Sequence, residues 1–123
     1  MPSVKDTLSD LMSIKGAVGC CLVDARSGLP VGIQGGGDLD LVSAAAWQTE
    51  ALRCGGAERT DGGDAEPIEE IVVTVGSHYH LVRAVETGVA SELFFYLVLD
   101  RKGSNLAMAR VRLGDAAQKV QLE

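Results

Sequence analysis

Apolar residues recur along this chain with two periods, which separate the expected helices from the expected strands. Helical spacing of three or four residues is found over 3–12, 38–54 and 105–116. Short runs rich in apolar and β-branched residues, typical of strands, occupy 17–24, 29–34, 68–75, 78–85 and 93–99. The pattern therefore predicts helices and strands in the order α-β-β-α-β-β-β-α.

The strands within each group are joined by turns of hairpin length, such as Arg26-Ser27-Gly28 and Gly76-Ser77. Such short connections join antiparallel neighbours. The run 93–99 is apolar on both faces, which places it in the middle of the sheet, whereas Pro30 places 29–34 at an edge. We expect an α/β (α+β) fold, a five-stranded antiparallel sheet with two helices on one face and the middle helix on the other.

The middle helix, expected over 38–54, has two apolar faces. Asp38 follows three glycines and is expected to cap its first turn. At about 100° per residue, the core-facing row consists of Leu41, Val42, Ala45, Thr49 and Leu52. A second row lies roughly 140° away and consists of Ala44, Trp47, Ala51 and Cys54.

This second apolar row requires a second partner, because a helix on one sheet buries only one stripe. The small residues of the row allow another helix to approach closely. One hypothesis is that the helix packs on a second copy of the chain. The alternative is that a terminal segment of the same chain covers it.

The outer helices have recognisable starts. Ser3 and Asp6 form an S-x-x-D cap for the first, and Ser104 or Asn105 caps the last. Gly114 is expected to kink or stop the last helix, and the tail beyond it has no strong pattern. The glycine-rich segment 55–67 is expected to be a mobile loop.

Length and composition predict a single domain spanning 1–123. The formal net charge of −6 argues against nucleic acid or an anionic membrane as the main partner. No apolar run reaches the length of a membrane span, and the first residues lack the layout of a secretory signal. Three cysteines do not make a disulfide framework, so the cytoplasm is the expected location.

Residue types that often carry chemistry are present, but their spacing does not assemble a site. His78 and His80 share one strand face without a visible third metal ligand, because the three cysteines lie on other elements. The adjacent residues Glu69 and Glu70 face apart, as do Cys20 and Cys21. The glycines before Asp38 lack the G-K-[ST] of a phosphate loop. We therefore expect no enzyme activity, no cofactor and no bound metal.

Three segments, taken with the order of elements, resemble the Roadblock domain family. They are GAVGCCLVDARSGLPVG, EEIVVTVGSHYHLVRAV and DRKGSNLAMARVRL. The family includes dynein-associated light chains and MglB-like bacterial regulators of Ras-like GTPases. The resemblance covers the chain from about residue 8 to residue 113.

The resemblance implies a non-catalytic homodimeric scaffold that binds a small Ras-like GTPase and modulates its nucleotide state. In the family, two sheets join through the strand that corresponds to 68–75, and the middle helices pack side by side. The implied interface residues are Ala44, Trp47, Ala51, Cys54, Ile71 and Val73. Two alternatives stay open: a structural adaptor or light chain without nucleotide preference, and a sensor that holds a small molecule between sheet and helix.

Overall fold

A computed structural model of the chain describes residues 3–55, 68–85 and 92–121. Its elements follow the predicted order. They are α1 (Val4–Met12), β1 (Ala17–Asp24), β2 (Leu29–Gly35), α2 (Leu41–Gly55), β3 (Glu70–Val75), β4 (His78–Ala84), β5 (Leu93–Asp100) and α3 (Leu106–Lys119). Most of the loop expected over 55–67 lies outside the described residues, and so does the turn that the sequence predicts at Thr87-Gly88 before the last strand.

The five strands form one antiparallel sheet in the order β2-β1-β5-β4-β3. The predicted places of two strands are confirmed. The strand β5, apolar on both faces, is central, and β2, which carries Pro30, is an edge strand. The opposite edge is β3, so the strand that the family resemblance marks for pairing is an edge strand.

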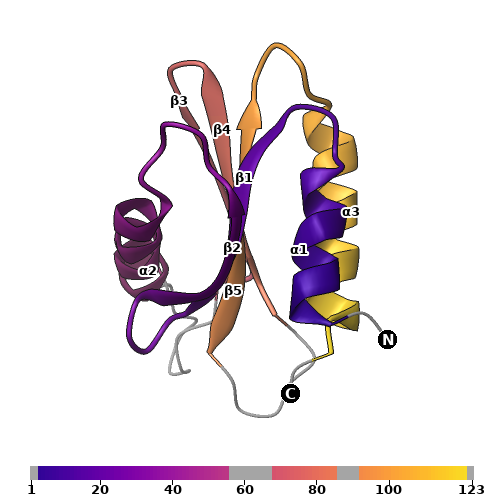
Figure 1. Cartoon of the computed structure of the whole chain (residues 1–123). Helices are drawn as coiled ribbons and strands as arrows, with labels where there is room; N and C mark the ends of the chain where they lie inside the picture. Colours follow the sequence, from indigo (N-terminus) through magenta and orange to yellow (C-terminus); the bar gives the residue numbers. More distant parts are fainter. Residues whose placement is uncertain (1–2, 56–67, 86–91, 122–123) are drawn as a thin grey trace, which may run out of the picture.

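Helices cover both faces of the sheet, as predicted. Figure 1 shows α2 alone on one side and α1 with α3 on the other. Each side has its own buried apolar cluster, and the side chains of β1 alternate between them. Cys20 belongs to the cluster under α1 and α3, whereas Cys21 belongs to the cluster under α2.

Side-chain caps fix where the helices begin. The Ser3 Oγ accepts a hydrogen bond from the Asp6 amide at 3.1 Å, which confirms the predicted cap of α1. Asn105 caps α3 by accepting from the Met108 amide at 3.1 Å. The prediction that Asp38 caps α2 is wrong. Asp40 performs this role, since the Ser43 amide donates to it at 3.1 Å.

The later start of α2 has a local cause. Gly36 and Gly37 adopt positive φ values of 112° and 53°, and the Leu39 amide closes a turn on the Gly36 carbonyl at 2.8 Å. This turn occupies residues 36–39, which are therefore not part of the helix. The helix therefore begins at Leu41, and Asp38 lies outside its first turn.

The helix α3 continues past Gly114, so the prediction of a stop there is wrong. Ala117 and Val120 are buried beyond that glycine, and their packing favours a further helical turn. Within the described residues, none of the helices is both long and apolar enough to cross a bilayer.

Candidate interaction site between α2 and the β3 edge

The two faces of α2 are distinct in the structure. Leu41, Ala45 and Thr49 are buried against the sheet, as the periodicity predicts, but Val42 is 48% exposed. The fourth residue buried on this face is Gln48. The prediction that Val42 faces the core is wrong, because at about 100° per residue the buried stripe extends toward Gln48 and leaves Val42 at its margin.

The second row of α2 lies toward the surface. Trp47 is 60% exposed, and Ala44 and Ala51 are half-buried. The side chain of Cys54 lies outside the described part of the chain. An indole left this open on a helix is unusual for a residue that normally buries a large apolar area.

Trp47 and Ala44 line a hollow between α2 and the β3–β4 hairpin. The hollow has a volume of about 250 Å³, and its surface is almost wholly apolar. Val73 and Val75 contribute to it from β3, while Ile71 on the same strand packs into the core beneath α2. We call this feature the Trp47 hollow; its lining residues are Ala44, Trp47, Gln48, Val73, Val75, His80 and Tyr96.

Three polar side chains that line the Trp47 hollow, those of Gln48, Tyr96 and His80, are linked by hydrogen bonds. The His80 Nδ1 lies 2.7 Å from the Tyr96 hydroxyl, and the two rings are stacked. Burial raises the pKa of Tyr96 to about 12, an effect that a hydrogen bond from Gln48 partly offsets. Burial also lowers the pKa of His80 from its usual 6.5, and the neighbouring His78 lowers it further. Both groups are therefore neutral near pH 7.

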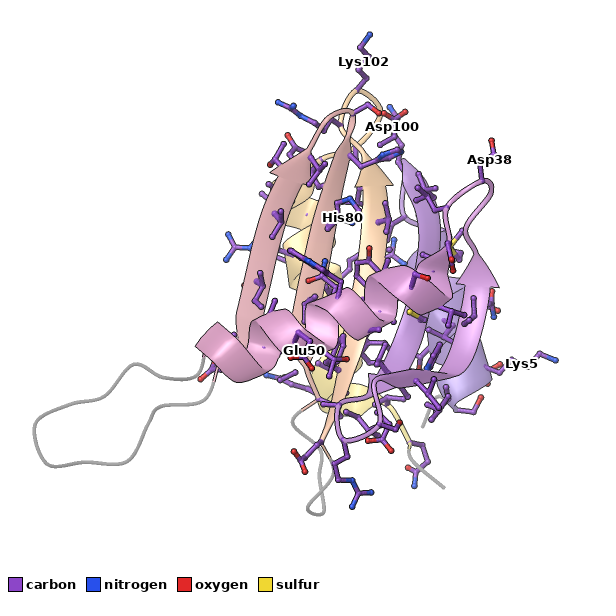
Figure 2. The ribbon with its side chains drawn as sticks, turned by 90° about the vertical axis from the view of Figure 1, so that its left-hand side faces the viewer. Lys5, Asp38, Glu50, His80, Asp100 and Lys102 are labelled. Carbon is purple, nitrogen blue, oxygen red and sulfur yellow. The ribbon has the colours of Figure 1, made fainter. Side chains whose placement is uncertain are left out.

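A neutral imidazole can donate or accept at Nδ1, so the direction of the His80–Tyr96 hydrogen bond depends on the tautomer of His80. We assign the Tyr96 hydroxyl as the donor to the His80 Nδ1 and the Gln48 amide group as the donor to the Tyr96 oxygen. Figure 2 shows His80 on the part of the sheet that α2, crossing obliquely, leaves uncovered. The polar residues that line the hollow, Gln48, His80 and Tyr96, are thus bonded to one another, although among the described residues the Gln48 Oε1 takes no part in these bonds.

The outer edge of β3 borders this surface. The Ala84 amide donates to the Glu69 carbonyl at 2.9 Å, and the pairing with β4 then alternates along the strand. The backbone groups of every second residue therefore point away from β4, and those residues are Glu70, Val72 and Thr74. Within the described residues no strand pairs with this side of β3.

On the opposite face of the sheet, an ion-pair cluster ties β3 to α3. Arg110 donates to both carboxylate oxygens of Glu70, at 2.6 and 2.9 Å, and Arg83 lies 3.7 Å from the same carboxylate. The hydrogen bond from Arg110 is the main cause that lowers the pKa of Glu70. These ion pairs connect β3 to α3 on the face of the sheet opposite α2, although surface ion pairs of this kind contribute modestly to stability.

The candidate residues for chemistry do not form a reactive group. The rings of His78 and His80 lie on one face with centroids 6.3 Å apart, as predicted. Among the described residues, no cluster of three or more His, Cys, Asp or Glu side chains is placed to hold a metal ion. Burial raises the pKa of Cys20 and of Cys21 to about 12, so neither is a thiolate at neutral pH.

Several members of this site were not among the residues predicted from the sequence. Gln48, Val75, His80 and Tyr96 line the hollow, whereas the prediction named Ala44, Trp47 and Val73 there. Val75 was recognisable, because it alternates with Val73 along β3. Tyr96 was not, because its position depends on the pairing of β5 with β4, which connects residues far apart in the sequence.

Comparison with known proteins identifies the fold. No protein-family model matches this sequence, and no curated protein matches it. Solved structures do match, over most of the chain. The gliding protein MglB from Thermus thermophilus has a TM-score of 0.78 and 16% identity, covering 94% of this chain and 83% of that one.

Two further solved structures are similar to this chain over most of its length. An MglB with a tetrameric arrangement has a TM-score of 0.77 and 18% identity, covering 94% of this chain and 82% of that one. The Roadblock/LC7 domain from Streptomyces avermitilis has a TM-score of 0.73 and 15% identity, covering 90% of this chain and 88% of that one. The chain therefore has the Roadblock fold, a five-stranded antiparallel sheet between helices, as the sequence resemblance predicted.

Proposed function

We propose that this protein is a non-catalytic homodimeric regulator that binds a small Ras-like GTPase and modulates its nucleotide state. The observation that carries the proposal is the location of an exposed tryptophan and an apolar hollow next to an open strand edge. All three lie on one side of the molecule, between α2 and β3.

The geometry supports self-association through this side. A two-fold axis beside β3 would pair the free backbone groups of Val72 and Thr74 with those of a second copy, giving one continuous sheet. The same axis would bring the two α2 helices together, with Ala44, Trp47 and Ala51 between them. One structural neighbour, an MglB, is described as having a tetrameric arrangement, so self-association occurs among proteins of this fold.

The interface that we propose keeps the residues named from the sequence: Ala44, Trp47, Ala51, Cys54, Ile71 and Val73. Within it, Trp47 and Val73 would contact the second copy directly. Ile71 would support the strand from below, because it packs into the cluster beneath α2. We also propose that the domain spans 1–123 and acts in the cytoplasm, in keeping with the free thiols of Cys20 and Cys21.

The GTPase partner rests on the resemblance to Roadblock regulators. Such a regulator acts by binding one nucleotide state of its partner more tightly, which shifts the population of the switch segments. The test is isothermal titration calorimetry of this protein against a Ras-like GTPase from the same genome, loaded with GDP or with a non-hydrolysable GTP analogue. We expect a difference of at least about tenfold in affinity between the two states.

The second candidate function is a structural adaptor without nucleotide preference. It is favoured by the described lining of the Trp47 hollow, in which none of the residues is Lys, Arg, Asp or Glu, so that these residues offer no charge to recognise a phosphate-dependent state. Equal affinity for both nucleotide states would establish the adaptor. Absence of binding in both states would refute the GTPase proposal.

A further inference from the structure

One buried polar atom of α2 lacks a partner. Gln48 is only 3% exposed, and within the described part of the chain its Oε1 accepts no hydrogen bond. Leaving a buried amide oxygen unpaired costs stability, so native structures usually satisfy such atoms. Because Gln48 is one of the residues that line the Trp47 hollow, a molecule seated in the hollow lies next to the side chain that carries this atom.

The hydrogen bonds among Gln48, Tyr96 and His80 determine which chemical group that molecule must present to Gln48. With Tyr96 assigned as the donor to His80, the Gln48 amide nitrogen donates to the Tyr96 oxygen, and the Gln48 Oε1 has no partner among the described residues. The free position is therefore an acceptor. The hollow around it is almost wholly apolar, so the matching group is a single hydrogen-bond donor carried on a large apolar body.

A tryptophan side chain has these properties, since indole is apolar apart from one N–H that only donates. The chain contains a single tryptophan, Trp47, and its side chain is mostly exposed on the same face. Trp47 and Gln48 are adjacent in α2. When two antiparallel helices pack around a two-fold axis near the 47–48 peptide, residue 47 of each helix lies opposite residue 48 of the other.

We propose that, in the homodimer, each Trp47 indole enters the hollow of the second copy and donates its Nε1–H to Gln48 Oε1. The inference rests on the dimer put forward under the proposed function and identifies the contact that sets its register. Two such bonds form per dimer, related by the two-fold axis. Each one satisfies an acceptor that is buried and unpaired in the single chain.

A double-mutant cycle on the full chain tests this contact. Trp47→Phe keeps an aromatic ring without the N–H, and Gln48→Leu removes the acceptor. Sedimentation equilibrium gives the dimer dissociation constant of wild type, both single variants and the double variant. We expect Trp47→Phe to weaken the dimer roughly ten- to thirtyfold and to have little further effect once Gln48 is Leu. Additive losses would overturn the inference.

A control cycle pairs Trp47→Phe with Gln118→Leu. Gln118 is an exposed glutamine on α3, on the opposite face of the sheet, and we expect no coupling there. Gln48→Leu also removes the hydrogen bond to Tyr96, but this loss is common to the single variant Gln48→Leu and to the double variant. The Tyr96 contribution then cancels.

Indole hydrogen exchange provides a second readout that does not depend on affinity. In ¹⁵N-labelled protein the single indole N–H resonance should become protected as concentration rises, and Gln48→Leu should abolish this protection in the remaining dimer. A dimer with a freely exchanging indole would refute the Trp47–Gln48 contact alone. A wild-type chain that stays monomeric would refute the dimer, and protection only after a GTPase is added would assign the hollow to that partner instead.

Discussion

Replacement of Trp47 by Asp separates the stability of the single chain from the stability of the dimer. The side chain is 60% exposed, so less than half of its area is covered in the folded monomer. We expect the free energy of unfolding of the monomer to fall by about 2 kcal/mol, because roughly 100 Å² of covered apolar surface is lost. The dimer should respond differently, because a carboxylate would have to enter an apolar hollow without a partner.

The size of the effect follows from the exposed area. Aromatic side chains bury up to about 250 Å² when fully covered, so the exposed fraction of Trp47 leaves roughly 150 Å² for a partner. If half of this area is covered in the dimer, at about 25 cal/mol per Å², each protomer contributes about 2 kcal/mol. Two protomers contribute about 4 kcal/mol, which corresponds to roughly a thousandfold in dissociation constant. The desolvation of Asp adds to this value.

The assay is sedimentation velocity over a series of protein concentrations, with urea unfolding of the monomeric variant followed by circular dichroism. The matched control is Val111→Asp, since Val111 on α3 is 61% exposed but lies on the opposite face of the sheet. We expect Val111→Asp to dimerise as wild type does. If Trp47→Asp dimerises equally well, Trp47 lies outside the interface and the reasoning from its exposure is wrong.

Three further predictions concern the strand edge, the histidine and the sheet. Thr74→Pro should weaken the dimer at least about tenfold without unfolding the chain, because its N–H points away from β4; Val73→Pro should unfold it, and sedimentation with circular dichroism distinguishes the two. Burial lowers the pKa of His80 below its usual 6.5, so the stability that neutral His80 contributes is fully present above that pH and is lost as the pH falls below it. Urea unfolding from about pH 8 to about pH 5 should therefore show a smaller loss of stability for His80→Gln than for wild type. Gly19→Ala would place a Cβ 2.7 Å from the Gly36 backbone and should lower the free energy of unfolding, measured in urea, by about 1–3 kcal/mol. In the control variant Gly103→Ala, the Cβ would come no closer than 3.7 Å to Asp100, and the loss should be less than about 0.5 kcal/mol.

The sequence predicts those parts of the fold that depend on local patterns. The bounds of β1 agree with the prediction at both ends, because an apolar run closed by a polar turn has few alternatives. The central place of β5 follows from its two apolar faces, and the edge place of β2 from Pro30. The family resemblance adds the fold itself, which the structural neighbours confirm.

The sequence does not predict features that depend on how distant segments meet. The start of α2 moved from Asp38 to Asp40 because two glycines with positive φ form a turn that no hydrophobic period reveals. Gln48 is a polar residue at a buried position, so a periodicity of apolar residues passes over it. Its partner Tyr96 comes from β5, and only the sheet order brings the two together.

Because side chains alternate between the two faces of the sheet along β1, Cys20 and Cys21 can report separately on the two faces. Cys20 and Cys21 are neighbours in sequence, yet the sheet separates their sulfur atoms into two apolar compartments. In a Cys54→Ser background, alkylation of Cys20 would record the loosening of the α1–α3 layer, and alkylation of Cys21 would record the loosening of α2. Mass spectrometry of modified peptides could thus time the opening of each layer separately within one unfolding experiment.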